Sequence, residues 1–233
     1  MTVLGLGAPE WGAIWLSVKV AMVATLVSLP IGLVTAYALA RGRFWGRGAL
    51  NVLVHLPLIM PPVVTGYLLL LTFGRRGPLG AAFEELFGLV FAFRWTGAAL
   101  AAAIMGFPLM VRAMRLAIES VDPKLEQAAE TLGASRLRVF ATITLPLILP
   151  GAIAGAVLGF AKGMGEFGAT ITFVSNIPGE TRTIPLAVNS LLEVPGGEPL
   201  AFRLAFVSIA IATVALGLSE WLSRLSKREA RDG

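Results

Sequence analysis

The sequence has no cysteine and a single histidine, His55. Without cysteine the protein can form no disulfide, thiolate metal site or iron–sulfur cluster, and it has no thiol nucleophile. One histidine excludes histidine-rich metal ligation. Charged residues are also scarce, at 14% of 233 residues, against about 25% in an ordinary soluble domain. These shortages argue against a soluble catalytic domain, and we expect no cofactor.

The sequence is instead rich in hydrophobic residues, which make up 56% of it. A transmembrane helix needs about 20 consecutive apolar residues. Five segments meet this requirement, at about residues 12–40, 49–74, 95–118, 147–174 and 200–222. We therefore predict an all-α polytopic membrane bundle of about five transmembrane helices, with residues 1–233 forming one domain. The second segment contains Pro57, Pro61 and Pro62 and is expected to bend there, while residues 184–194 are too short to cross.

Basic residues fall unevenly on the two sides of the expected membrane. Twelve lie after the first span, from the end of the third span to the fourth and at the C-terminal end, whereas five lie on the other side. Lys19 and Lys162 lie within spans and are assigned to neither side. Because cytoplasmic loops are enriched in Lys and Arg, this asymmetry predicts an outside N-terminus and a cytoplasmic C-terminus. It also accounts for the net charge of +5. Because cytoplasmic loops of membrane proteins account for these basic residues, we expect a lipid bilayer and no nucleic acid as partner.

The loop between the third and fourth spans, at about 119–146, contains a predicted amphipathic helix. Asp122 and Pro123 form a helix-start signal, with Asp at the N-cap and Pro at the first helical position. Gly133 predicts the end of this helix, because glycine adopts a left-handed conformation without a Cβ clash. One face carries an apolar stripe, formed by Leu125, Ala128, Ala129 and Leu132. Periodicity alone leaves two positions open for this helix, on the bilayer surface or against its own bundle.

The spacing along this loop resembles the cytoplasmic signature of bacterial ABC importer permeases. Their consensus runs Glu-Ala-Ala, three residues, Gly, nine residues and Ile-x-Leu-Pro. The matching residues here are Ala128-Ala129, Gly133, Ile143 and Leu145-Pro146. Gln127 stands where the consensus has Glu, and Glu126 lies one place earlier.

The resemblance implies that this short helix docks into a cleft on a cytoplasmic ABC ATPase and passes its motion to the membrane helices. The sequence has no G-x-x-x-x-G-K-[ST] loop of its own, so ATP hydrolysis must reside on a partner subunit and the chain itself is not expected to be an enzyme. The positions assigned to ATPase coupling are Leu125, Gln127, Ala128, Ala129, Leu132, Gly133, Ile143, Leu145 and Pro146.

A second region is similar to the fourth-to-fifth-span part of molybdate permeases. It comprises the runs GEFGAT at 165–170 and FVSNIPGETRT at 173–183, and the LEQAA run at 125–129 is also similar to this group. The resemblance implies an ATP-driven importer of molybdate or tungstate that works by alternating access. It implies a homodimer in the bacterial inner membrane, with two cytoplasmic ABC ATPase subunits and an external molybdate-binding protein. Sulfate permeases share the Gly-Glu-Phe-Gly-Ala core, so a sulfate or thiosulfate importer is the alternative.

Four polar residues are candidates for the translocation pathway or a gate. Lys162 and Glu166 are four residues apart on one helix face and can neutralise each other, either as a structural lock or as a gate element. Thr65 and Thr170 are candidate lining groups, although helical threonines more often bond their own backbone. A glycine ridge along the fourth span indicates close helix packing, either within one subunit or in a homodimer contact. Its members are Gly151, Gly155, Gly159 and Gly163.

Two other classes of membrane protein fit the sequence less well. An intramembrane enzyme would need a Ser/His or Asp/Asp pair or an H-E-x-x-H zinc site, and the chain has one histidine and no Asp within any expected span. An autonomous channel or secondary transporter predicts internal repeats with broken helices near the midplane. No repeat is visible, and the docking loop would then have no purpose.

Overall fold

The structure, a computed structural model, describes the backbone of residues 5–232 and the side chains of residues 5–218 and 221. Every regular element of this described part is helical, as predicted. In chain order the elements are α1 (Ala8–Arg41), α2 (Arg47–Ile59), α3 (Pro62–Phe73), α4 (Pro78–Phe87), α5 (Trp95–Ser120), α6 (Pro123–Thr131), α7 (Arg136–Val139), the π-helical turn η2 (Phe140–Thr144), α8 (Leu145–Met164), α9 (Gly168–Val174), α10 (Ile184–Leu192) and α11 (Glu198–Asp232).

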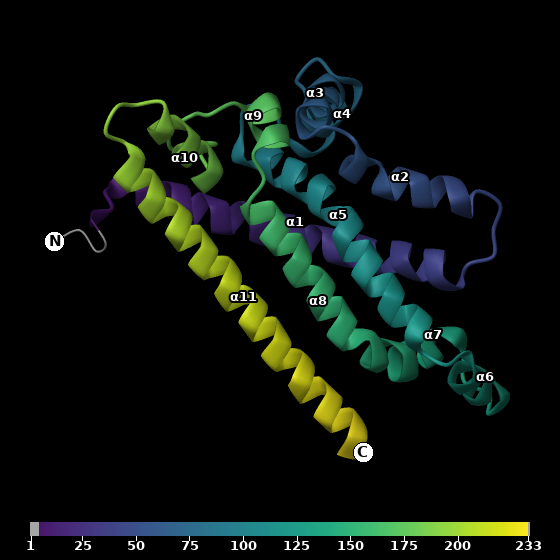
Figure 1. The fold of residues 1–233 in the computed structure, drawn as a ribbon. Coiled ribbons are helices and arrows are strands. Elements are labelled where there is room, and N and C mark those ends of the chain that lie inside the picture. The colour runs from purple at the N-terminus through teal and green to yellow at the C-terminus, as the bar shows by residue number, and fades with distance from the viewer. Residues whose placement is uncertain (1–4, 233) are drawn as a thin grey trace.

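Three long helices form the centre of the molecule. Helix α5 packs along both α1 and α8, and α11 packs along α8 (Figure 1). Four helical stretches of the described chain are long and apolar enough to cross a membrane, and the bent pair α2–α3 makes a fifth if it counts as one span. This agrees with the prediction of about five transmembrane helices. Figure 1 places α6 and α7 at the opposite end of the bundle from α9 and α10.

The glycine ridge of α8 packs within the chain. A Cβ atom added to Gly155 would lie 3.0 Å from the carbonyl oxygen of Met110, and one added to Gly163 would lie 3.4 Å from the Cα of Ala21. A Cβ on Gly106 of α5 would lie 3.0 Å from the carbonyl oxygen of Gly159. Glycine therefore brings the backbones of α5, α8 and α1 together, and of the two expected uses of this ridge the structure shows packing inside one subunit.

Two of the expected spans are broken. The chain bends by 115° between α2 and α3, because Pro61 and Pro62 supply no amide hydrogen to continue α2. This is the bend expected from the prolines. The prediction of one continuous helix over 147–174 is wrong. Helix α8 ends at Met164 and α9 begins at Gly168, with Phe167 as its N-cap. At this break the Glu166 carboxylate accepts the Ala169 amide hydrogen at 3.0 Å.

The short helix α10 occupies most of the 184–194 segment that was expected not to cross the membrane. Its nine residues are well short of the roughly 20 that a span requires. The buried Ser17 hydroxyl of α1 accepts the Ile184 amide hydrogen at 2.7 Å and so holds the start of α10 against α1.

Candidate functional site

The start of α6 follows the expected capping pattern. Asp122 is the N-cap, and its carboxylate accepts the Lys124 amide hydrogen at 2.9 Å. Pro123 takes the first helical position, where a missing amide hydrogen costs nothing. The helix therefore begins where the Asp-Pro pair predicts.

The end of α6 requires glycine because of its backbone conformation. Gly133 has φ = 87°, in the left-handed region that residues with a Cβ rarely adopt. Its amide donates to the Glu130 carbonyl at 3.0 Å, and the Ala134 amide donates to the Ala129 carbonyl at 3.1 Å. These two bonds form a Schellman motif, which closes the helix. A Cβ at Gly133 would meet nothing within 4 Å, so the constraint is the φ angle and not space.

The apolar stripe of α6 faces away from the chain's own bundle. Leu132 is 89% exposed and Leu125 is 49% exposed, and no residue of α6 is buried. Ala128 and Gln127 are also exposed, and Ala129 is partly so. The open alternative that this helix packs against its own bundle is therefore wrong. Helix α6 lies at one end of the bundle (Figure 1), and its small and apolar side chains are open to contact there.

The chain runs from α6 back into the bundle through a π-helical turn. Helix α7 begins after Ser135, whose hydroxyl accepts the Arg138 amide hydrogen at 3.4 Å. It continues directly through η2, which holds Ile143, into α8, which begins with Leu145 and Pro146. Single π-helical turns inside α-helices are frequent at functional sites. The Ile-x-Leu-Pro residues therefore lie in the continuous helical stretch that connects the loop to α8.

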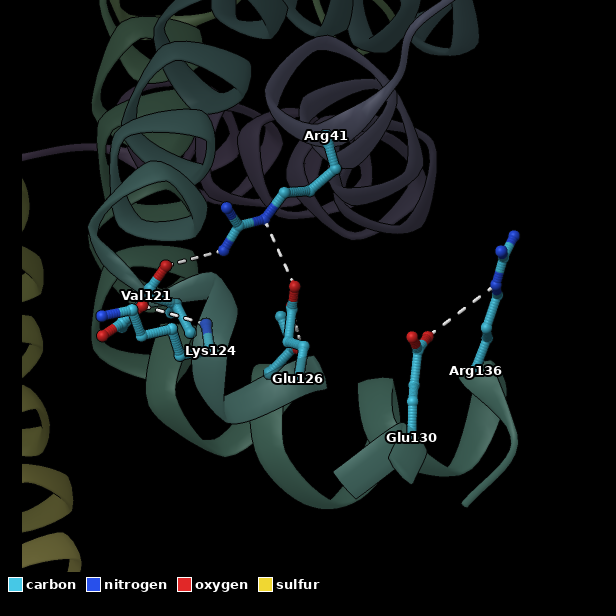
Figure 2. Close-up of polar contacts among 8 residues, drawn as sticks. Arg41, Val121, Lys124, Glu126, Glu130 and Arg136 are labelled. Atoms are coloured by element: carbon cyan, nitrogen blue, oxygen red, sulfur yellow. Dashed lines mark hydrogen bonds and ion pairs between the residues drawn. The ribbon is translucent and has the colours of Figure 1, made fainter. Parts of the chain in front are cut away.

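A polar anchor, formed by Arg41, Val121, Glu126 and Thr144, holds α6 to the membrane helices. Figure 2 shows the contacts of Arg41 with Val121 and Glu126. The Glu126 carboxylate lies 3.6 Å from the Arg41 Nε and accepts a 2.7 Å hydrogen bond from the Thr144 hydroxyl. The Arg41 guanidinium also donates to the Val121 carbonyl at 2.7 Å. Sequence reasoning missed this anchor. The only local signal was a Glu one place before the consensus position.

A cavity of about 700 Å³ lies beside the anchor. Its walls come from the last turns of α1 on one side and from α6, α7 and η2 on the other. Across it Tyr37 and Phe140 make an edge-to-face ring contact, with centroids 5.4 Å apart. The lining residues are Leu33, Val34, Tyr37, Ala38, Arg41, Gly42, Glu126, Glu130, Arg136, Leu137, Val139 and Phe140.

At the other end of α8, the predicted charge pair is present. The Lys162 Nζ lies 2.9 Å from the Glu166 Oε2, and the Glu166 side chain is 2% exposed. The second carboxylate oxygen accepts the Ala169 amide hydrogen at 3.0 Å. A lone charge at the bilayer centre costs about 3 kcal/mol on insertion scales, so the ion pair and the hydrogen bond from Ala169 together offset the cost of burying this carboxylate.

The structure brings the two broken spans together. A Cβ on Gly66 of α3 would lie 2.5 Å from the Ala169 carbonyl oxygen of α9, and one on Gly168 would lie 2.7 Å from the Pro62 Cβ. The candidates Thr65 and Thr170, each adjacent to a residue of this contact, are both buried. The Thr65 hydroxyl has no hydrogen-bond partner among the described residues. All four pathway candidates thus lie on α3, α8, α9 or the break between α8 and α9, apart from the coupling loop.

The apolar helices and the exposed loop define a class of protein, a multi-pass helical membrane protein. Residues 28–228 match the family described as the binding-protein-dependent transport system inner membrane component, and the chain belongs to that family. It is accordingly a multi-pass inner-membrane transport subunit whose ATPase activity lies in a separate subunit, as the sequence predicted.

Individual members of this family are similar to the chain over most of its length. The chain is 61% identical over 222 residues to the molybdenum transport system permease protein ModB of Escherichia coli K12, covering 95% of this chain and 97% of that protein. It is 36% identical over 220 residues to the sulfate transport system permease protein CysW of Escherichia coli K12, covering 94% of this chain and 75% of that protein. The solved structure of a bacterial alginate ABC transporter has the same fold, with a TM-score of 0.75, 18% identity, and coverage of 95% and 81% of the two chains.

Proposed function

We propose that this chain is the membrane subunit of an ATP-driven importer of molybdate, with tungstate as a close chemical equivalent. The observation that supports the coupling mechanism is the exposed face of α6, which is held out from the bundle by a capped start and a glycine-closed end. The whole chain 1–233 acts as one transmembrane domain, and the loop 119–146 is its coupling element.

The working unit in this proposal is a homodimer with two cytoplasmic ABC ATPase subunits and an external molybdate-binding protein. The N-terminus lies outside and the C-terminus lies in the cytoplasm, in keeping with the uneven distribution of Lys and Arg. When the ATPases close, they draw the two α6 helices together and switch the pathway from outward to inward access. The docking face comprises Leu125, Gln127, Ala128, Ala129, Leu132 and Gly133, and Ile143, Leu145 and Pro146 carry the motion into α8.

Within the membrane, Lys162 and Glu166 act as a structural lock. Their direct contact supports this role over that of a free cation, because a lone positive charge would retain a dianion that has to leave. Thr65 and Thr170 are proposed as neutral groups beside the pathway, where hydroxyls can contact an oxyanion without trapping it.

The choice of molybdate over sulfate is supported by the higher identity to the molybdenum permease, 61% against 36% for the sulfate permease. The test is reconstitution of the chain with its ATPase and binding protein in proteoliposomes, followed by uptake of radiolabelled molybdate and sulfate. We expect ATP-dependent molybdate uptake that excess unlabelled tungstate suppresses and that excess sulfate leaves unchanged.

A second sample holds the membrane subunit alone. We expect no accumulation in it, because the chain lacks a nucleotide-binding loop. Uptake without the ATPase would overturn the proposed mechanism, and uptake of sulfate in preference to molybdate would overturn the proposed substrate.

A further inference from the structure

Helix α6 has few attachments to the bundle through which its motion could pass. None of its residues is buried, and its closest backbone neighbours are α7 and η2, which follow it in the chain. On the side of α1, the cavity of about 700 Å³ lies between the two elements. A displacement of α6 must therefore reach α1 through individual side-chain contacts.

Glu126 is the side chain of α6 that makes these contacts. Its two carboxylate oxygens serve different elements, because Oε1 accepts from the Thr144 hydroxyl of η2 and Oε2 faces the Arg41 guanidinium of α1. Arg41 also holds the Val121 carbonyl, at the point where the chain leaves α5 for α6. One carboxylate thus joins the coupling helix to the last residue of α1 and to the turn that leads into α8 (Figure 2).

The surroundings of this carboxylate distinguish it from a surface ion pair. The Arg41 and Glu126 side chains are 20% and 16% exposed, and Thr144 is fully buried. Four residues further along the same helix, Glu130 pairs with Arg136, whose side chain is 96% exposed. Salt and water weaken an exposed pair, whereas a partly buried one keeps a fixed geometry.

We propose that Glu126 is a positioning residue that transmits the displacement of α6 to α1 and α8. The inference rests on the proposed function, because it assumes that an ATPase moves α6. Glu126 directs its carboxylate toward the bundle. The next residue, Gln127, fills the consensus position and is exposed. The docking face and the transmitting residue are then on different sides of one short helix.

The test compares Glu126→Gln with Glu130→Gln in the complete transporter in proteoliposomes. Both variants remove one carboxylate from α6 and keep its size, and neither changes the docking leucines. For Glu126→Gln we expect the ATPase to co-purify as in the wild type, while molybdate imported per ATP hydrolysed falls by a factor of about 5–30, as befits one charge-assisted contact. For Glu130→Gln we expect a change of less than about twofold.

A second pair of variants isolates the hydrogen bond to η2. Thr144→Val removes the hydroxyl and keeps the shape, and Thr144→Ser restores the donor. We expect Thr144→Val to lower the transport-to-hydrolysis ratio and Thr144→Ser to recover it. This pair keeps the proposal testable even if Glu126→Gln fails to fold.

The outcomes separate this inference from the proposed function. If wild-type transporter imports molybdate and Glu126→Gln keeps the wild-type ratio, or if both Glu variants lower it equally, Glu126 does not transmit the motion. A wild-type ratio in Thr144→Val, or a ratio in Thr144→Ser as low as in Thr144→Val, would likewise remove the η2 contact from the proposal. If the wild-type chain neither binds an ATPase nor imports an oxyanion, the proposed function itself is wrong.

Discussion

The two ends of α8 are built on opposite physical principles. At the coupling loop, α6 is held by a polar anchor and leaves its apolar side chains exposed. At the break between α8 and α9, Gly66 and Gly168 bring α3 and α9 into close contact, and the Glu166 carboxylate is buried and paired with Lys162. Close packing leaves no room for sliding, whereas a polar anchor beside a cavity permits a small displacement. In the proposed mechanism, the end at the α8–α9 break stays fixed while the end at the coupling loop receives the motion of the ATPase.

The largest loss of stability is expected at the α3–α9 contact, where the two backbones lie closest. Gly66→Ala places a Cβ 2.5 Å from the Ala169 carbonyl oxygen, so α3 and α9 must separate, at a cost of about 3 kcal/mol. The measurement is thermal unfolding of the purified protein in detergent. Gly217→Ala is the matched control, because a Cβ there meets nothing within 4 Å. Equal stability of the two variants would show that the α3–α9 contact is not tight.

The charge pair at the break comes next. Lys162→Met leaves the Glu166 carboxylate buried without its cation, and we expect a loss of about 2 kcal/mol, less than for a fully buried pair because Lys162 is partly exposed. The double variant Lys162→Met/Glu166→Gln is expected to be milder than either single change. A double-mutant cycle of unfolding temperatures measures this coupling. Additive losses would reject the pair as a lock.

At the coupling loop, a substitution of Gly133 is expected to affect ATPase docking more than the stability of the fold. Gly133→Val forces a β-branched residue into the left-handed region, at a strain of about 1–2 kcal/mol, whereas Gly133→Asn tolerates that conformation. We expect Val to weaken ATPase co-purification roughly 5–30-fold and to abolish transport, while the strain lowers the unfolding temperature by only about 2–8 °C. Asn is expected to be close to wild type. Normal assembly and transport by Gly133→Val would show that the shape of this turn does not matter for docking.

The smallest effect is expected at the exposed pair of α6. Arg136→Ala removes the partner of Glu130, and because this pair is open to solvent we expect a stability change within about 0.5 kcal/mol. Thermal unfolding at low and high salt checks it. A larger loss of stability would mean that the Glu130–Arg136 pair also anchors the loop. The exposed pair would then not differ from the partly buried Glu126–Arg41 pair.

Local patterns predicted the parts of this molecule that depend on neighbouring residues. Asp122 starts α6 and Gly133 ends it, because caps act within a few residues of the helix that they close. The pairing of Lys162 with Glu166 follows from their spacing of one helical turn. The bend at Pro61 follows from the missing amide hydrogen of proline.

The parts that sequence reasoning missed depend on contacts between distant residues or on competition between two helices. Arg41 and Val121 are 80 residues apart in the chain, and no periodicity links them. The break between Met164 and Gly168 lies in an apolar run that fits one continuous helix equally well, so the sequence pattern did not show it. The η2 turn was also missed, since its residues fit an α-helix equally well.

The η2 turn fixes which way α7 faces. A π-helical turn holds one residue more than an α-helical turn, and each residue of an α-helix contributes about 100° of rotation. Shortening the stretch from Phe140 to Thr144 by a single residue would thus swing the exposed Leu137 about a quarter of a circle around the axis of α8. The one additional residue of η2 therefore sets the direction in which α7 and its exposed Leu137 point.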